Sequence, residues 1–228
     1  MVIEPILISL KTASVAILFT FVIGTFLAYV VFKMKNGVIK SVVDTILTLP
    51  LVLPPTVAGF FLLYIFGVYR PLGRLLGYIG IKIVFSWPAT VLAAVVIALP
   101  LMYRSAKGAF QQVDPIYMQA ARTIGMSNVH IAFRILFPLS GPGLASGGIL
   151  AFSRGLGEFG ATAMIAGNIA GVTRTMPLAI YSAVSGGNME LAYSYVVVLV
   201  LISFIFVWGL NYVTEHGSNK RRASSDQD

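Results

Sequence analysis

Long apolar runs separated by short polar segments are the dominant pattern in this chain. A helix needs about 20 apolar residues to cross a bilayer core about 30 Å thick, and five runs approach or exceed that length. The pattern therefore predicts an all-α, multi-pass membrane protein with about five membrane-spanning helices. The predicted spans are Thr12–Phe32, Val43–Phe66, Trp87–Tyr103, Ser140–Ile165 and Leu191–Tyr212.

Composition supports a membrane location and narrows the chemistry. Hydrophobic residues make up 57% of the chain and charged residues 11%, whereas a soluble domain has about 25% charged residues. The absence of cysteine excludes disulfides, thiolate catalysis and cysteine-containing zinc sites. The two histidines, His130 and His216, are too few for a histidine metal cluster. We therefore expect no metal site and no cofactor bound by this chain.

The distribution of lysine and arginine between the loops predicts the orientation. Cytoplasmic loops carry an excess of these residues, and placing the N-terminus outside puts ten of them in inside loops and four in outside loops. The prediction is N-out, C-in, and the net charge of +8 indicates cytoplasmic loops rather than a nucleic-acid partner. The inside set is Lys33, Lys35, Lys40, Arg104, Lys107, Arg122, Arg134, Lys220, Arg221 and Arg222, and the outside set is Arg70, Arg74, Lys82 and Arg174.

These patterns predict one transmembrane domain and a short tail. Residues 1–213 form the domain, with a cytoplasmic segment over residues 104–138. Residues 214–228 form a basic, polar, cytoplasmic tail that we expect to be disordered. The first apolar run has no basic segment before it, so we expect a retained helix rather than a cleaved signal peptide.

The cytoplasmic segment has the signals of two short helices joined by a turn. Asp114 suits an N-cap and Pro115 the first helical position, which predicts a helix to about Ile124. Gly125 suits a left-handed C-cap, and Ser127 can cap a second helix.

The second predicted helix covers Asn128 to about Leu136, and Pro138 marks the return to the membrane. We expect Ala120 and Ala121 to make the middle of the exposed face small enough for another surface to approach closely. The alternative is an ordinary amphipathic loop lying on the membrane.

The fourth predicted span is rich in small residues and contains two ionisable groups. Gly143 and Gly147 form a pair suited to close helix packing, within the chain or across a dimer seam, and direct substrate contact is the alternative. Arg154 and Glu158 are four residues apart, and ionisable residues inside a span indicate a functional site. A mutually neutralising structural pair is the alternative. In a continuous helix Glu158 would lie about 30 Å beyond Pro138.

Prolines interrupt the second predicted span. Pro50, Pro54 and Pro55 each remove a backbone hydrogen bond, so we expect a hinge or pore-lining bend there, with a purely structural kink as the alternative. On the outside, Arg174, Arg70 and Arg74 give a basic bias suited to anion approach or to an acidic partner. Solvated loop charge is the alternative for these arginines.

Absent motifs limit the function classes. The chain has no G-x4-G-K-[ST], G-x-S-x-G or H-E-x-x-H, so we expect neither nucleotide binding nor enzyme activity in this chain. A secondary transporter would usually show more carboxylates inside its spans and two matching halves. Because five spans are an odd number, a pore is most simply completed by a homodimer with ten membrane-spanning helices.

The cytoplasmic segment resembles a known sequence motif. QAARTIG, followed by ILFP, is similar to the EAA motif of ABC importer permeases, E-A-A-x3-G-x9-I-x-L-P. Gln119 replaces the usual Glu and Phe137 the usual Leu. The resemblance implies a type I permease fold in which this elbow binds a partner ATPase subunit. The implied ATPase-coupling residues are Gln119, Ala120, Ala121, Gly125, Ile135 and Pro138.

Other stretches narrow the resemblance. LPLVLPPTVAG (49–59), FSRGLGEFGATAMIAGN (152–168) and the following TRTMPLAIY are similar to permease subunits of molybdate/tungstate importers, with sulfate/thiosulfate permeases as close relatives. If this segment lines a pathway, our hypothesis is that Arg154 offsets the charge of a passing oxyanion and that Glu158 prevents the anion from being trapped. The implied pathway or gate residues are Arg154, Gly157, Glu158, Gly160 and Thr162.

The resemblance also implies the assembly. Two copies of the chain would form the pathway in the cell membrane, two ATP-binding cassette subunits would hold ATP and Mg²⁺, and an extracellular or periplasmic protein would deliver the oxyanion. Molybdate or tungstate is the expected substrate. A sulfate/thiosulfate permease and an ATP-independent secondary anion transporter are the alternatives.

Overall fold

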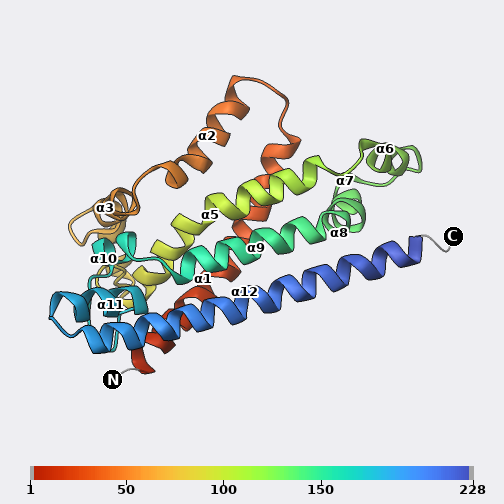
Figure 1. Ribbon diagram of the computed structural model, residues 1–228. Helices are drawn as coiled ribbons and strands as arrows, with labels where there is room; N and C mark the ends of the chain where they lie inside the picture. Colours follow the sequence, from red (N-terminus) through yellow and green to blue (C-terminus); the bar gives the residue numbers. More distant parts are fainter. Residues whose placement is uncertain (1–2, 226–228) are drawn as a thin grey trace.

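The secondary structure is helical throughout the described part of the chain (Figure 1). The computed structural model describes residues 3–225, with side chains described as far as Gly209 and at Tyr212. The elements are α1 Ile3–Lys33, α2 Val38–Val52, α3 Pro55–Phe66, α4 Pro71–Tyr78, α5 Trp87–Gln111, α6 Pro115–Thr123, α7 Asn128–Ile131, the π-helical η1 Ala132–Leu136, α8 Phe137–Leu139, α9 Gly141–Leu156, α10 Gly160–Ile165, α11 Met176–Ser185 and α12 Met189–Ser225.

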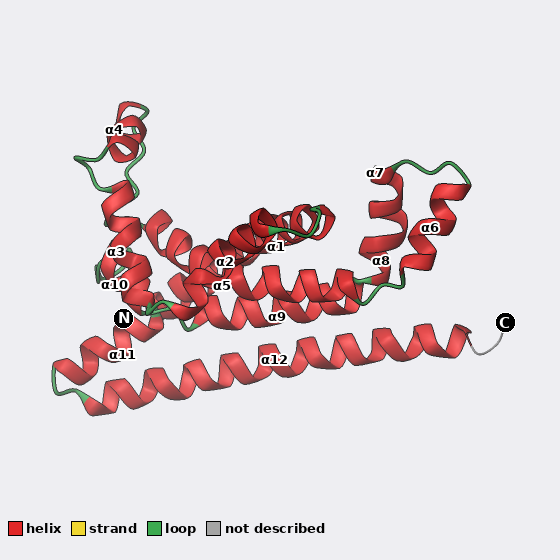
Figure 2. Cartoon of the chain, turned by 90° about the horizontal axis from the view of Figure 1, so that it is seen from above, coloured by secondary structure: helices red, strands yellow, loops and turns green. Residues whose placement is uncertain are grey.

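The long helices run side by side, and the short ones gather at their two ends (Figures 1 and 2). α1, α5 and α9 pack against one another, and α12 lies along α9. The elbow, α6 to α8, projects from one end, which we call the elbow end. α3, α4, α10 and α11 lie at the opposite end, which we call the far end (Figure 1). The two termini lie at opposite ends, as an N-out, C-in chain requires, although which end faces the cytoplasm stays a prediction.

Five predicted spans correspond to three long helices and two bent pairs. α1, α5 and α12 as far as Gly209 are long and apolar enough to cross a membrane. α2 and α3 form one pair, bent by 112°, and residues 128–139 with α9 form the other, bent by 70°. The all-α membrane fold is therefore confirmed, with five spans if each bent pair crosses once.

Three details of the predicted elements were wrong. The fourth span is not one helix, because α9 ends at Leu156 and α10 begins at Gly160. Pro50 lies inside α2, so the break falls after Val52, and only Pro54 and Pro55 are at the bend. The tail expected to be disordered continues α12 as far as Ser225, and residues 226–228 lie outside the described part.

Glycines on α9 allow it to approach α5 closely. A Cβ added to Gly147 would lie 2.6 Å from the Cβ of Ser105, and one added to Gly143 would lie 2.5 Å from the Cβ of Ala109. Both distances are shorter than atoms can approach, so each position requires glycine. The predicted small-residue pair therefore packs within the chain, against α5.

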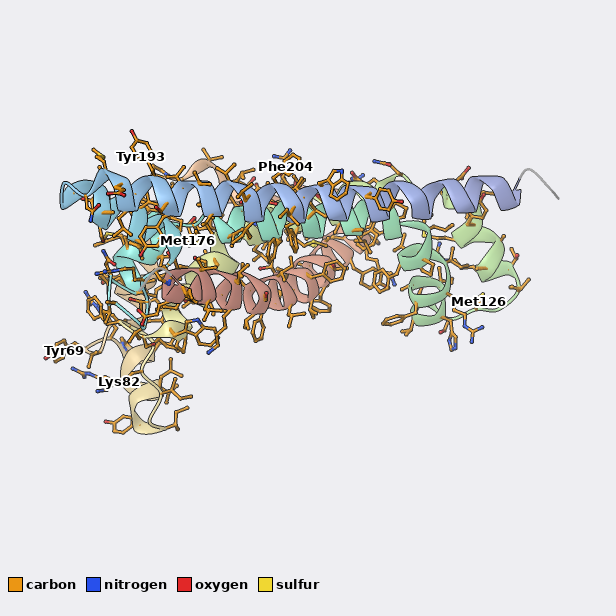
Figure 3. The ribbon with its side chains drawn as sticks, turned by 60° about the horizontal axis from the view of Figure 1, so that its bottom comes forward. Tyr69, Lys82, Met126, Met176, Tyr193 and Phe204 are labelled. Atoms are coloured by element: carbon orange, nitrogen blue, oxygen red, sulfur yellow. The ribbon has the colours of Figure 1, made fainter. Side chains whose placement is uncertain are left out.

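Polar contacts between α1 and α5 satisfy hydroxyl groups that would otherwise be buried alone. Thr12 Oγ1 and Thr90 Oγ1 are hydrogen-bonded at 2.9 Å, and Trp87 Nε1 donates to Thr12 Oγ1 at 3.1 Å. Nearby, α11 begins with Met176 N donating to Ser9 Oγ of α1 at 2.8 Å. Such interhelical hydrogen bonds hold membrane helices in register where the hydrophobic effect gives little attraction. Figure 3 shows Met176 inside this packing, and Tyr193 and Phe204 on the uncovered face of α12.

The contact between α9 and α5 leads to a prediction with an internal control. Gly147→Ala places a methyl group against Ser105 and is expected to destabilise the protein by about 1–3 kcal/mol, as overpacking does. Gly148→Ala meets only ordinary contacts, 3.5 Å from the Phe21 ring, and is expected to be neutral or stabilising by up to about 1 kcal/mol. Thermal unfolding of both variants in the same detergent measures the difference, and equal midpoints would contradict this packing.

Candidate functional site: the elbow and two helix breaks

The first helix of the elbow is formed by the predicted local signals. Asp114 Oδ1 accepts a hydrogen bond from the backbone N–H of Ile116 at 2.9 Å, and Pro115 occupies the first turn of α6. Gly125 has φ +81°, a conformation that favours glycine. The N–H of Met126 donates back to the carbonyl of Ala121 at 3.0 Å, which closes the end of the helix. The predicted helix–turn is confirmed.

The second helix is longer than predicted. Ser127 Oγ accepts from the backbone N–H of His130 at 3.3 Å, as an N-cap does. The helix then continues through the π-helical turn to Leu139 instead of ending near Leu136. The 70° bend into α9 comes at Ser140, two residues after the predicted re-entry at Pro138.

The exposed face of the elbow differs from the prediction at one position. Ala121 is 3% exposed, so only Ala120 and Gln119 remain accessible near the middle of the face. α6 packs against the second elbow helix, and this packing accounts for the burial of Ala121. Of the remaining implied coupling residues, Gly125 and Pro138 are exposed and Ile135 is half-buried.

Large apolar side chains also lie uncovered on the elbow. Ile116 is 60% exposed and Ile124 is 77% exposed, and Tyr117 lies beside them on α6. Figure 3 places Met126 at the tip, away from the packed helices. Exposed apolar side chains on a projecting segment favour contact with another protein.

Glu158 joins the end of α9 to the start of α10. Its side chain is 2% exposed, and Oε2 accepts from Arg154 Nη1 at 2.7 Å. Its Oε1 accepts from the backbone N–H of Ala161 at 2.8 Å. The predicted ion pair is therefore present, but it spans a break between helices rather than one face of a continuous helix. Arg154 keeps 32% of its side chain exposed, so it remains accessible to an anion.

The break after α9 lies against the break before α3. A Cβ on Gly160 would be 3.1 Å from the Cβ of Pro55, and a Cβ on Gly59 would be 2.7 Å from the Cα of Ala161. The predicted hinge and the predicted pathway segment, about 100 residues apart in sequence, therefore meet at the far end. Of the other pathway residues, Thr162 is buried and Gly157 is exposed. Broken helices at membrane depth occur where they are buried in protein or line a cavity.

The outer-face arginines lie at the far end but not in one cluster. Arg174 Nε donates to Asn168 Oδ1 at 2.8 Å in the loop before α11. The guanidinium of Arg70 lies 3.7 Å from the centre of the Tyr64 ring, and Arg74 is exposed on α4. The predicted basic bias is therefore spread over two segments, the loop before α11 and the first turn of α4.

An ion pair that the sequence analysis missed ties α2 to α5. Asp44 Oδ1 accepts from Lys107 Nζ at 2.7 Å and also from the hydroxyl of the buried Tyr103. α2 has no buried residue of its own, so this contact is its principal polar attachment among the described residues. The sequence contained one sign of this contact, the single acidic residue in the apolar stretch VVDTILTLP. Its partner is 63 residues away, so the sequence pattern could not identify the pair.

The described part of the chain is a bundle of helices with a helical elbow at one end and two facing helix breaks at the other. The solved structures most useful for comparison are ABC importers. A methionine ABC transporter, MetNI, in an inward-facing conformation matches with TM-score 0.76 and 17% identity over 95% of each chain. A bacterial ABC transporter that imports the polysaccharide alginate matches with TM-score 0.79 and 15% identity over 94% of this chain and 79% of that one. These matches show the type I ABC importer permease fold.

Sequence relatives identify the family. The chain belongs to the binding-protein-dependent transport system inner membrane components, whose profile matches residues 6–215. It is 42% identical to the putative molybdenum transport system permease protein YvgM of Bacillus subtilis, over 93% of each chain. It is 44% identical to the molybdenum transport system permease protein ModB of Escherichia coli K12, over 78% of each. The chain is therefore a multi-pass inner membrane protein of a binding-protein-dependent importer.

The attachment of α2 gives a testable prediction. Asp44→Asn and Lys107→Gln each remove the ion pair, so the double variant is expected to lose less stability than the sum of the two single losses. The coupling energy is expected to be about 0.5–3 kcal/mol, the range for groups in contact. Hydrogen exchange of the α2 amides should accelerate in each variant, while that of the α9 amides should not. Lys40→Gln, which removes a cation hydrogen-bonded to the Met34 carbonyl and to Asn36 Oδ1, is the control. Additive losses would show that the pair does not hold α2.

Proposed function

We propose that the chain is the permease subunit of an ATP-driven importer for a tetrahedral oxyanion, molybdate or tungstate. The observation that carries the proposal is the identity of 39–44% over most of the chain to relatives named for molybdenum transport. The elbow geometry supports the importer class independently of those names. Selectivity among oxyanions is expected to reside largely in the binding protein.

The elbow would transmit work from the ATPase. A helix with an exposed Ala120 allows close approach, and the apolar Ile116 and Ile124 beside it provide area for burial in a cleft of the partner. Gln119 is uncharged, so docking would depend on packing more than on an ion pair at that position. ATP and Mg²⁺ would bind to the partner subunit, and this chain would take no chemical part in hydrolysis.

A second copy of the chain would complete the pathway. On α2, Ile46 and Val52 are 61% and 81% exposed, and on α3 Phe60 is 52% exposed. Lipid alone cannot cover this side, because the backbone at the break between α2 and α3 needs polar partners or protein cover. A homodimer with two elbows and two ATPase subunits satisfies this requirement.

The paired breaks would form the gated part of the pathway. Discontinuous membrane helices commonly build substrate sites, and Arg154 is an accessible cation beside one of them. Glu158, buried and bonded to both Arg154 and the start of α10, would keep that cation from binding an anion too tightly. The far end would face outward, where Arg174, Arg70 and Arg74 favour approach of an anion or an acidic protein.

Reconstitution tests the proposal and its substrate together. The chain, its ATPase and its binding protein are placed in liposomes, and ATP hydrolysis is measured with the binding protein loaded with molybdate, tungstate or sulfate. Stimulation by molybdate or tungstate is expected, because the relatives of this chain are named for molybdenum transport. Stimulation by sulfate alone would reassign the substrate. Oxyanion uptake that persists without ATP would replace the importer with a secondary transporter.

The role of Arg154 is tested separately from that of Glu158. Arg154→Gln is expected to lower uptake about tenfold through loss of one charge-assisted contact of about 1.5 kcal/mol, with ATPase docking unchanged. Arg154→Lys retains the charge and is expected to restore most uptake.

Glu158→Gln keeps an oxygen for Ala161 but leaves Arg154 unneutralised, so it should slow release of the anion. Unchanged uptake in Arg154→Gln and Glu158→Gln would reduce the pair to a structural role.

A further inference from the structure

Two adjoining cavities lie between α1 and the elbow. The larger has a volume of about 520 Å³, within the range of about 300–1,000 Å³ typical of ligand pockets. Its walls are almost entirely hydrocarbon. The lining residues are Phe21, Val22, Thr25, Phe26, Tyr29, Val129, Ala132, Phe133, Phe137 and Leu144.

The smaller cavity, of about 360 Å³, has both apolar and basic side chains in its lining. Lys33, Arg122 and Asn128 line it, and Tyr29 and Ala132 line both cavities, so the two adjoin. Lys33 Nζ lies 4.7 Å from the centre of the Tyr29 ring. No carboxylate lines either cavity, so the two cations are not neutralised there by the described part of the chain.

Along α1, exposed apolar residues are followed by a basic residue, in the same order as the hydrocarbon and headgroup regions of one leaflet. Val22 and Phe26, 67% and 61% exposed, lie in the membrane-spanning part of α1, and Lys33 is its last residue. Across the groove, Val129 and Phe133 are 63% and 67% exposed. Large uncovered apolar side chains suit the hydrocarbon region, and basic side chains at the end of a span suit the headgroup region.

We infer that these joined cavities, the elbow groove, bind one phospholipid with an anionic headgroup. Its phosphate would lie at Lys33 and Arg122, and an acyl chain would lie against Phe26 and Phe133. Acidic residues of a partner protein could also meet the two cations, but they would leave the adjoining hydrocarbon cavity unfilled. A lipid fills both cavities with one molecule, and it would link α1 to the elbow. The inference is independent of the substrate proposed above.

Spin-labelled lipids test the site directly. The purified full-length chain is placed in phosphatidylcholine nanodiscs with a trace of spin-labelled phosphatidylglycerol or spin-labelled phosphatidylcholine, and the immobilised fraction of each is measured. Wild type is expected to immobilise phosphatidylglycerol preferentially. The double variant K33Q/R122Q is expected to lower that preference about tenfold, since basic side chains attract anionic lipid.

Matched controls separate this site from general surface charge. K35Q/R134Q removes the same two charges from neighbouring exposed positions that do not line the groove, and it should keep the preference. Val22→Trp, at an exposed position on α1, should fill the acyl cavity and lower immobilisation of both lipids.

Three outcomes would overturn the inference. Equal immobilisation of the two lipids by wild type would remove the basis for an anionic site. An equal loss in K33Q/R122Q and K35Q/R134Q would show that only surface charge matters. Complete displacement of the lipid by the bound ATPase subunit would assign Lys33 and Arg122 to that protein. The assay needs no transport, so failure of the proposed function would not affect it.

Discussion

Backbone hydrogen bonding in a low-dielectric environment is the constraint on which the rest of this structure depends. A helix that ends at membrane depth leaves N–H and C=O groups that lipid cannot satisfy. Two of the described helices end inside predicted spans, after Val52 and after Leu156. Prolines remove N–H groups at the first break, and the Glu158 carboxylate accepts one at the second. The two breaks then pack against each other through Gly59 and Gly160.

The parts that were predicted correctly are those with local causes. Asp114, Gly125 and Ser127 each act on backbone groups within five residues, so their spacing in the sequence was enough to place the elbow. Apolar runs gave the spans because their length is set by the bilayer. The small pair Gly143 and Gly147 was visible as a packing face because glycines four apart lie on one side of a helix.

The parts that were missed depend on contacts between distant segments. The spacing of Arg154 and Glu158 fits a helical pair, and nothing local showed that α9 would end at Leu156 and that Glu158 would also bond the start of α10. Ala121 was expected to be exposed, but the second elbow helix covers it. The pairing of Asp44 with Lys107 depends on how α2 lies against α5, which no pattern within either helix records.

The same contacts determine how motion at the elbow would reach the breaks. α6 follows α5, and the second elbow helix leads into α9. Both ends of the elbow are therefore connected to the packed pair of α5 and α9. That pair is locked by Gly143 and Gly147 and by Ser140 Oγ, which donates to the Ala109 carbonyl at 3.3 Å. A close-packed pair resists bending along its length. Displacement at the elbow would therefore tilt α5 and α9 together, and the change in shape would concentrate where helices are already interrupted, at Glu158 and Pro55. α2 is held to α5 by the contacts of Asp44 with Lys107 and Tyr103, and its Val43 and Leu47 pack against the core. Loss of the Asp44–Lys107 pair would therefore weaken the coupling of α2 to this tilt.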